Sequence, residues 1–68
     1  MEQSITVNGS VHAWAPGDTV GSLLATLGLD RRKVAVERNA AIVPRSTYDD
    51  TGLAPADQIE VVHFIGGG

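Results

Sequence analysis

The sequence has 68 residues, no cysteine and a formal net charge of −3. This length corresponds to one small domain with a marginal hydrophobic core, and without cysteine neither disulfides nor thiolate metal sites can stabilise it. Five lysines and arginines are too few for the basic face that nucleic acid binding requires. The first residues lack the apolar run of a signal peptide, and no stretch has the roughly 18 apolar residues of a membrane span. We therefore expect a cytoplasmic protein that contacts neither nucleic acid nor membrane.

The first elements along the chain form a predicted β-hairpin. Residues 4–8 alternate polar and apolar side chains, as a half-buried strand does. Asn8-Gly9 is a strong hairpin signal because both residues tolerate positive φ. The return strand spans residues 10–15. On it, we expect Trp14 in the core or at its edge rather than in a binding site, and His12 in a structural role.

A helix is predicted after Thr19, whose hydroxyl can accept hydrogen bonds from the free amides of the first turn. Four apolar residues at helical spacing give it one buried stripe: Val20, Leu23, Leu24 and Leu27. Gly28 ends the helix, and Leu29 can fold back on the last turn. We expect Leu24, at the centre of the stripe, to be deeply buried.

Three more strands are predicted in the second half of the chain. One spans residues 34–38 after a turn at 30–33, a short one spans 41–43, and the last spans 58–64. Because Pro44 has no N–H to donate to a ladder, the short strand must lie at a sheet edge.

The connection between the last two strands contains its own structure. Residues 46–49 predict one capped helical turn that Tyr48 anchors, and Leu53 is the next candidate for burial. Hairpin, helix, strand, edge strand and final strand define an α+β fold, with a mixed sheet of four to five strands packed on one main helix. This order resembles the β-grasp, or ubiquitin-like, architecture, in which the last strand lies beside the first. We expect a β-grasp domain over residues 1–65 and a flexible glycine tail over 66–68.

The sequence closes with three glycines whose backbone has no side chains. Gly66, Gly67 and Gly68 can therefore enter a slot too narrow for any Cβ. Three extended residues reach roughly 10 Å, which would carry a terminal carboxyl into the active site of another protein. A frayed or artificial terminus is the alternative, and the tail alone does not decide between the two.

Several stretches of the sequence form a combination that is fairly specific. They are VAVERN at 34–39, IVPRS at 42–46 and DQIEVV at 57–62, with VNG at 7–9 and GDTV at 17–20. Together with the terminal glycines they resemble the sulfur carrier proteins of thiamine biosynthesis, the ThiS family. The resemblance extends over essentially the whole chain. Ala40 and Ala56 depart from it, because the family commonly has turn glycines at these positions, so these two turns can differ.

The resemblance implies a carrier protein rather than an enzyme. A ubiquitin-activating-type enzyme would use ATP to adenylate the carboxylate of Gly68, with Gly67 beside it, and sulfur would replace the adenylate to give a thiocarboxylate. Thiazole synthase would then take the sulfur into the thiazole ring of thiamine. The chain itself would bind no cofactor or metal and would be a monomer when free.

Other functions stay open at this point. Side chains of the types found in catalytic triads occur at five positions: Ser46, His12, His63, Asp49 and Asp57. No nucleophile motif frames them, and two histidines without cysteine make a poor metal set. A second alternative is a sister sulfur carrier, such as the small subunit of molybdopterin synthase. A third is a β-grasp adaptor that only binds.

A partner-binding surface is predicted from alternation in the final strand. If Ile59 faces the helix, Val62 and Phe64 face away from it. An exposed apolar pair beside a functional tail indicates a docking patch, to which Ile65 is added. The alternative is a bulge near His63 that turns Phe64 or Ile65 back into the core.

Overall fold

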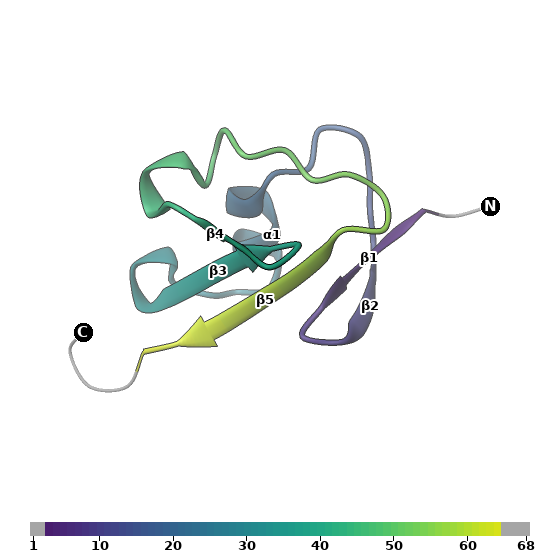
Figure 1. Cartoon of the computed structure of the whole chain (residues 1–68). Coiled ribbons are helices and arrows are strands. Elements are labelled where there is room, and N and C mark those ends of the chain that lie inside the picture. Colours follow the sequence, from purple (N-terminus) through teal and green to yellow (C-terminus); the bar gives the residue numbers. More distant parts are fainter. Residues whose placement is uncertain (1–2, 65–68) are drawn as a thin grey trace.

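The computed structural model describes residues 3–64. The predicted tail and Ile65 lie outside this range, so the roles assigned to Ile65, Gly66, Gly67 and Gly68 stay predictions. In the described part, five strands form one sheet, and one α-helix lies behind it in Figure 1. Within residues 3–64 no helix is long and apolar enough to span a membrane. The cytoplasmic location also stays a prediction.

The sheet has its last strand at its centre. The strands are β1 (Ser4–Val7), β2 (Ser10–Ala13), β3 (Val34–Arg38), β4 (Ala41–Val43) and β5 (Gln58–His63). Their order is β2-β1-β5-β3-β4, in which β5 runs parallel to β1 and antiparallel to β3. The edge position of β4 agrees with Pro44, which follows it. This is the predicted β-grasp arrangement.

The two hairpins of the sheet turn through residues with positive φ. Asn8 and Gly9 have φ of 50° and 83°, and Asn39 and Ala40 have φ of 52° and 70°. Two consecutive positive φ values are the type I′ pattern, which matches the twist of paired strands. Ala40 therefore keeps a left-handed backbone despite its Cβ, and Ala56 does the same with φ of 70°. Each such alanine costs roughly 1–2 kcal/mol relative to a right-handed residue.

The helix α1 (Val20–Thr26) begins and ends at capped residues. The Thr19 hydroxyl accepts from the Ser22 amide at 3.0 Å, and the Ser22 hydroxyl accepts from the Thr19 amide at 2.8 Å. This reciprocal pair is a capping box. At the other end Gly28 has φ of 71°, and the Leu29 amide donates to the Leu24 carbonyl at 2.9 Å. The predicted start and end of the helix are confirmed.

The core lies between α1 and the inner face of the sheet. Its buried residues are Ile5, Val7, Val20, Leu23, Leu24, Val34, Val36, Val43, Tyr48, Leu53, Ile59 and Val61. Leu24 is only 1% exposed, as predicted. Trp14 packs at the core edge, and its indole N–H donates to the Leu53 carbonyl at 2.8 Å.

Two local predictions need correction. The return strand of the first hairpin ends at Ala13, not at residue 15, and Trp14 continues its pairing only through the backbone of Gln3. The helical turn near Tyr48 is a 3₁₀ segment, η2 (Arg45–Thr47), whose N-terminus has no side-chain cap because Pro44 precedes it. A second 3₁₀ segment, η1 (Arg31–Lys33), connects α1 to β3.

Tyr48 nevertheless anchors its turn as predicted. It is 2% exposed, and its hydroxyl donates to the Val34 carbonyl at 3.3 Å. The loop that Tyr48 holds down contacts α1 directly, since the Gly21 amide donates to the Tyr48 carbonyl at 2.8 Å.

Candidate functional site

The C-terminal half of β5 is the described part of the candidate site, because it leads into the predicted tail. The pairing of β5 with β1 includes only Gln58 and Ile59, whereas its pairing with β3 continues to His63. Beyond Ile59 the strand therefore extends past the end of β1, as Figure 1 shows. β3 therefore supports β5 from Ile59 to His63, the last residue of the strand.

The side chains of this segment alternate as predicted. Ile59 and Val61 are buried, whereas Val62 is 58% and Phe64 43% exposed. The register with β3 is unbroken, and the Phe64 amide donates to the Lys33 carbonyl at 2.9 Å, one residue past the end of β5. The alternative of a bulge near His63 is therefore wrong for the described residues. Whether Val62 and Phe64 contact a partner stays a prediction.

Asn8 holds β5 where β1 ends. Its side-chain oxygen accepts from the Val61 amide at 2.8 Å, and its side-chain nitrogen donates to the Val61 carbonyl at 3.1 Å. The amide thus replaces the backbone of a strand residue and extends the ladder beside β5. The left-handed conformation of Asn8 in the turn aims the side chain at β5. Sequence reasoning identified Asn8 only as a turn residue.

Asn39 holds the other end of β5 from the second hairpin. Its side-chain oxygen accepts from the Gln58 amide at 2.9 Å, and its side-chain nitrogen donates to the Asp57 carboxylate at 3.0 Å. Each hairpin turn therefore begins with an asparagine whose side chain binds β5 or the residue before it. These side chains therefore fix β5 at its first residue, Gln58, and at Val61.

Asp57 organises the loop that enters β5. Asp57 is 5% exposed, and its carboxylate accepts from the Arg38 Nε at 2.7 Å, the Ala54 amide at 2.8 Å and the Asn39 side chain. Burial raises the pKa of the Asp57 carboxyl, but the hydrogen bonds from Ala54, Asn39 and Arg38 outweigh it and bring the pKa below its ordinary value. A buried carboxylate this well paired is a structural group.

Two of the five side chains of catalytic-triad type, those of Asp49 and Asp57, form structural contacts. Asp49 forms a bidentate ion pair with Arg31 at 2.7 and 2.8 Å. That pairing lowers the pKa of Asp49, the largest cause being the hydrogen bond from Arg31. Asp57 stabilises the loop that enters β5 by accepting from the Ala54 amide. Among residues 3–64 no group of three His, Cys, Asp or Glu side chains could hold a metal ion.

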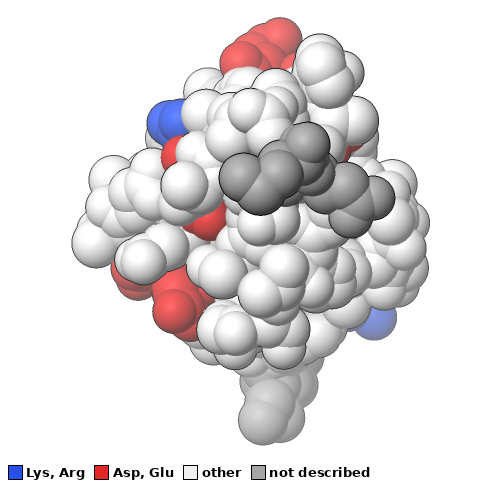
Figure 2. Space-filling model, turned by 90° about the vertical axis from the view of Figure 1, so that its right-hand side faces the viewer, with Lys and Arg blue, Asp and Glu red and all other residues white. Residues whose placement is uncertain are grey.

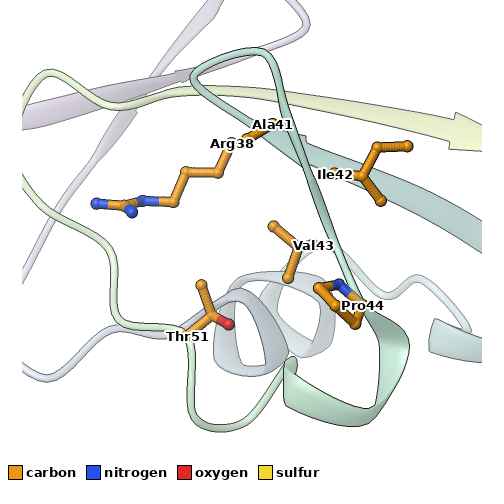
Figure 3. A pocket seen from close by; sticks show the side chains of 6 residues that line it. All are labelled: Arg38, Ala41, Ile42, Val43, Pro44 and Thr51. Atoms are coloured by element: carbon orange, nitrogen blue, oxygen red, sulfur yellow. The ribbon is translucent and has the colours of Figure 1, made fainter.

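A small hollow beside β4 does not resemble a substrate site. It has a volume of about 200 Å³ and lies between Arg38, β4 and Thr51. Figure 3 shows Val43 pointing toward Thr51, whereas Ile42 lies on the opposite side of β4. Since the Arg38 guanidinium binds Asp57, and ligand sites usually measure roughly 300–1,000 Å³, we assign no ligand to this hollow.

The fold and the site together define a class of protein: a β-grasp domain that presents an extension of its central strand. The ThiS family model matches residues 5–68, which include the three glycines. The chain is 38% identical over 65 residues to the sulfur carrier protein ThiS of Bacillus subtilis, covering 94% of this chain and 98% of that protein. The chain therefore belongs to the ThiS family, as predicted, and family membership supports a carrier protein rather than an enzyme.

A solved structure and two longer proteins are also similar to this chain. A crystal structure of the thiamine biosynthesis protein ThiS from Geobacter metallireducens superposes with a TM-score of 0.75 at 32% identity, covering 96% of this chain and 99% of that one. The chain is also 55% identical over 64 residues to a thiazole synthase of Magnetococcus marinus and 47% identical to one of Paramagnetospirillum magneticum. It covers 94% of its own length in both matches but spans only 20% of each synthase.

Proposed function

We propose that the chain is a sulfur carrier of thiamine biosynthesis whose Gly68 carboxylate is adenylated and then converted to a thiocarboxylate. The observation that carries the proposal is the ThiS family match, which runs through residue 68 and so includes the glycines. The partners would be an adenylating enzyme of the ubiquitin-activating type and a thiazole synthase. Relatives that are themselves thiazole synthases contain this domain, which supports the second partner.

The chemistry needs little from the carrier beyond an accessible carboxylate. The carboxylate of Gly68 attacks the α-phosphate of ATP, and pyrophosphate leaves to give a mixed anhydride with AMP. A sulfur donor at the oxidation level of hydrosulfide then attacks the acyl carbon, and AMP leaves. One C–O bond has been exchanged for a C–S bond, with no net oxidation. The absence of cysteine means that no thiol of the chain competes for the activated carboxyl.

In this proposal the chain contributes position, because the glycines follow in sequence a strand, β5, that lies at the centre of the sheet. A partner can then enclose the segment without unfolding the domain. Gly67 and Gly68 offer no side chain that would obstruct this enclosure.

Intact mass spectrometry tests the proposal. The chain is incubated with its cognate adenylating enzyme, ATP and a sulfur source, and it should gain the mass of one oxygen-to-sulfur exchange at Gly68. Deletion of Gly68 should abolish the gain, and Gly67→Val should reduce its rate sharply without changing Tm, since a branched side chain restricts the backbone and needs space in the slot. An unchanged mass for the wild-type chain under turnover conditions would refute the carrier function.

A further inference from the structure

The face of the sheet opposite α1 is an uncovered surface with an unusual composition. We call it the outer face, and its strand residues are Ser4, Thr6, Val11, Ala13, Ala35, Glu37, Ile42, Gln58, Glu60, Val62 and Phe64, which directly follows β5. All four large hydrophobic side chains that the described residues expose lie on it, namely Val11, Ile42, Val62 and Phe64. A two-layer fold with one helix leaves this face open.

Glu37 and Glu60 are the only charged residues of the five strands on this face, and they lie directly opposite each other. They form a cross-strand pair of β3 and β5. The neighbouring bonds, from the Phe64 amide to Lys33 and from the Asn39 amide to Gln58, make it a hydrogen-bonded pair, whose Cα atoms lie about 5.5 Å apart. Like charges in this position repel each other. Among residues 3–64 neither carboxylate forms a salt bridge.

The two carboxylates border a hollow large enough for a side chain of another protein. Its volume is about 450 Å³, and Glu37, Ala40, Gln58, Glu60 and Val62 line it. Ile42 lies beside Glu37 in the next strand, so apolar side chains flank the acidic pair on β4 as well as on β5. An arginine or lysine with an apolar surround would complement such a surface in both charge and polarity.

We propose that the outer face docks onto thiazole synthase, and that one arginine or lysine of the synthase binds between Glu37 and Glu60. The proposal rests on the proposed carrier function, because the docked partner is the enzyme that receives the sulfur. Continuity supports the choice of partner: Glu60, Val62 and Phe64 lie on the strand that continues into the glycines. Two relatives named thiazole synthase contain a segment similar to this domain, which supports the choice of the synthase as the partner.

If this site binds a cation of the partner, removing one glutamate charge should affect the stability of the free chain and the stability of the complex in opposite directions. The repulsion between Glu37 and Glu60 is present in the free chain and is relieved only when the cation of the partner binds. Removing one charge should therefore leave the free fold as stable as before or more stable, while it weakens the complex. A residue that merely supports the fold would change stability and binding in the same direction.

The main variants are Glu37→Gln and Glu60→Gln, measured with the purified thiazole synthase of the same organism. Isothermal titration should show binding roughly 10- to 100-fold weaker for each variant, as expected when a hydrogen bond to a charged group is lost. Binding of the wild type should weaken with added salt, and binding of the variants should depend less on salt. Their Tm should equal or exceed that of the wild type.

Asp50→Asn is the matched control, since it removes the same charge from an exposed residue in the loop that contacts α1. It should bind like the wild type. Variant affinities equal to that of the wild type would overturn the docking proposal, and so would an equal loss for the control. The wild-type chain is assayed in parallel for sulfur acquisition by mass, so a failure of the carrier function is seen separately from a failure of the docking site.

Discussion

Replacing Asn8 with glycine separates the two roles that the structure gives this residue. Glycine adopts the φ of 50° at least as readily as asparagine, so the type I′ turn is retained. What is lost is the pair of hydrogen bonds at 2.8 and 3.1 Å between the side-chain amide and the backbone of Val61. If Asn8 served the turn alone, Asn8→Gly would be neutral or stabilising.

The magnitude follows from those two bonds. Each contributes about 0.5–1.5 kcal/mol net, so Asn8→Gly should lower the unfolding free energy by about 1–3 kcal/mol. In a domain of this size each kcal/mol corresponds to roughly 4–8 °C in Tm. Asn8→Asp is the companion variant, because it keeps the acceptor for the Val61 amide but turns an oxygen toward the Val61 carbonyl. It should also be less stable than the wild type.

Urea unfolding followed by tryptophan fluorescence measures the effect, since Trp14 is the only tryptophan and packs at the core edge. Amide hydrogen exchange by NMR localises it: the Val61 amide should exchange faster in Asn8→Gly, while the Val36 amide in the centre of the sheet should be affected only through global stability. An Asn8→Gly variant as stable as the wild type, with unchanged Val61 exchange, would refute the reasoning.

Three further outcomes are expected. Ala40→Gly and Ala56→Gly should each raise the unfolding free energy by about 1 kcal/mol in urea titrations, because both alanines have φ of 70°, and a lower value would contradict the strain argument. Phe64→Ala should lower the unfolding free energy by far less than the roughly 3–5 kcal/mol typical of a core phenylalanine, since Phe64 is 43% exposed. It should weaken binding to the adenylating enzyme or thiazole synthase by about 2 kcal/mol. A loss of stability as large as that of a core phenylalanine would exclude Phe64 from a docking patch. The pKa values of Asp57 and of Asp30, the latter about 2, lie below the ordinary value of 3.8. The stability that these two carboxylates contribute is therefore complete above pH 3.8 and is lost as the pH falls through the folded-state pKa. Unfolding free energies should decline below about pH 4, and Asp57→Asn should flatten that decline.

Local patterns in the sequence predicted the elements, because each pattern depends on residues close in the chain. The place of β5 beside β1 was instead implied by the resemblance to the β-grasp architecture. Period-two alternation, the Asn8-Gly9 turn and the Thr19 and Gly28 caps are local in this sense. Alternation also predicted that Val62 and Phe64 are exposed. The lack of a donor at Pro44 was sufficient to place β4 at the edge.

The contacts that fix β5 could not be predicted in the same way. The bonds from Asn8 to Val61 span 53 residues, and the ion pair of Arg38 with Asp57 spans 19. They depend on which strands become neighbours, and a side-chain amide that imitates a backbone has no local signature. The left-handed conformations of Ala40 and Ala56 were also missed, because alanine gives no signal for positive φ and the surrounding register imposes it.

The central place of β5 has a mechanical consequence for any partner that draws the C-terminal segment into a narrow slot. Such a partner pulls on β5 along its own axis. The ladders with β1 and β3 cross this axis, and the asparagine amides at 8 and 39 add bonds in the same direction. The load therefore acts in shear on hydrogen bonds at both sides of β5, whereas a strand at a sheet edge has such bonds on one side only. We therefore expect the domain to stay folded when a partner applies force to its C-terminal segment.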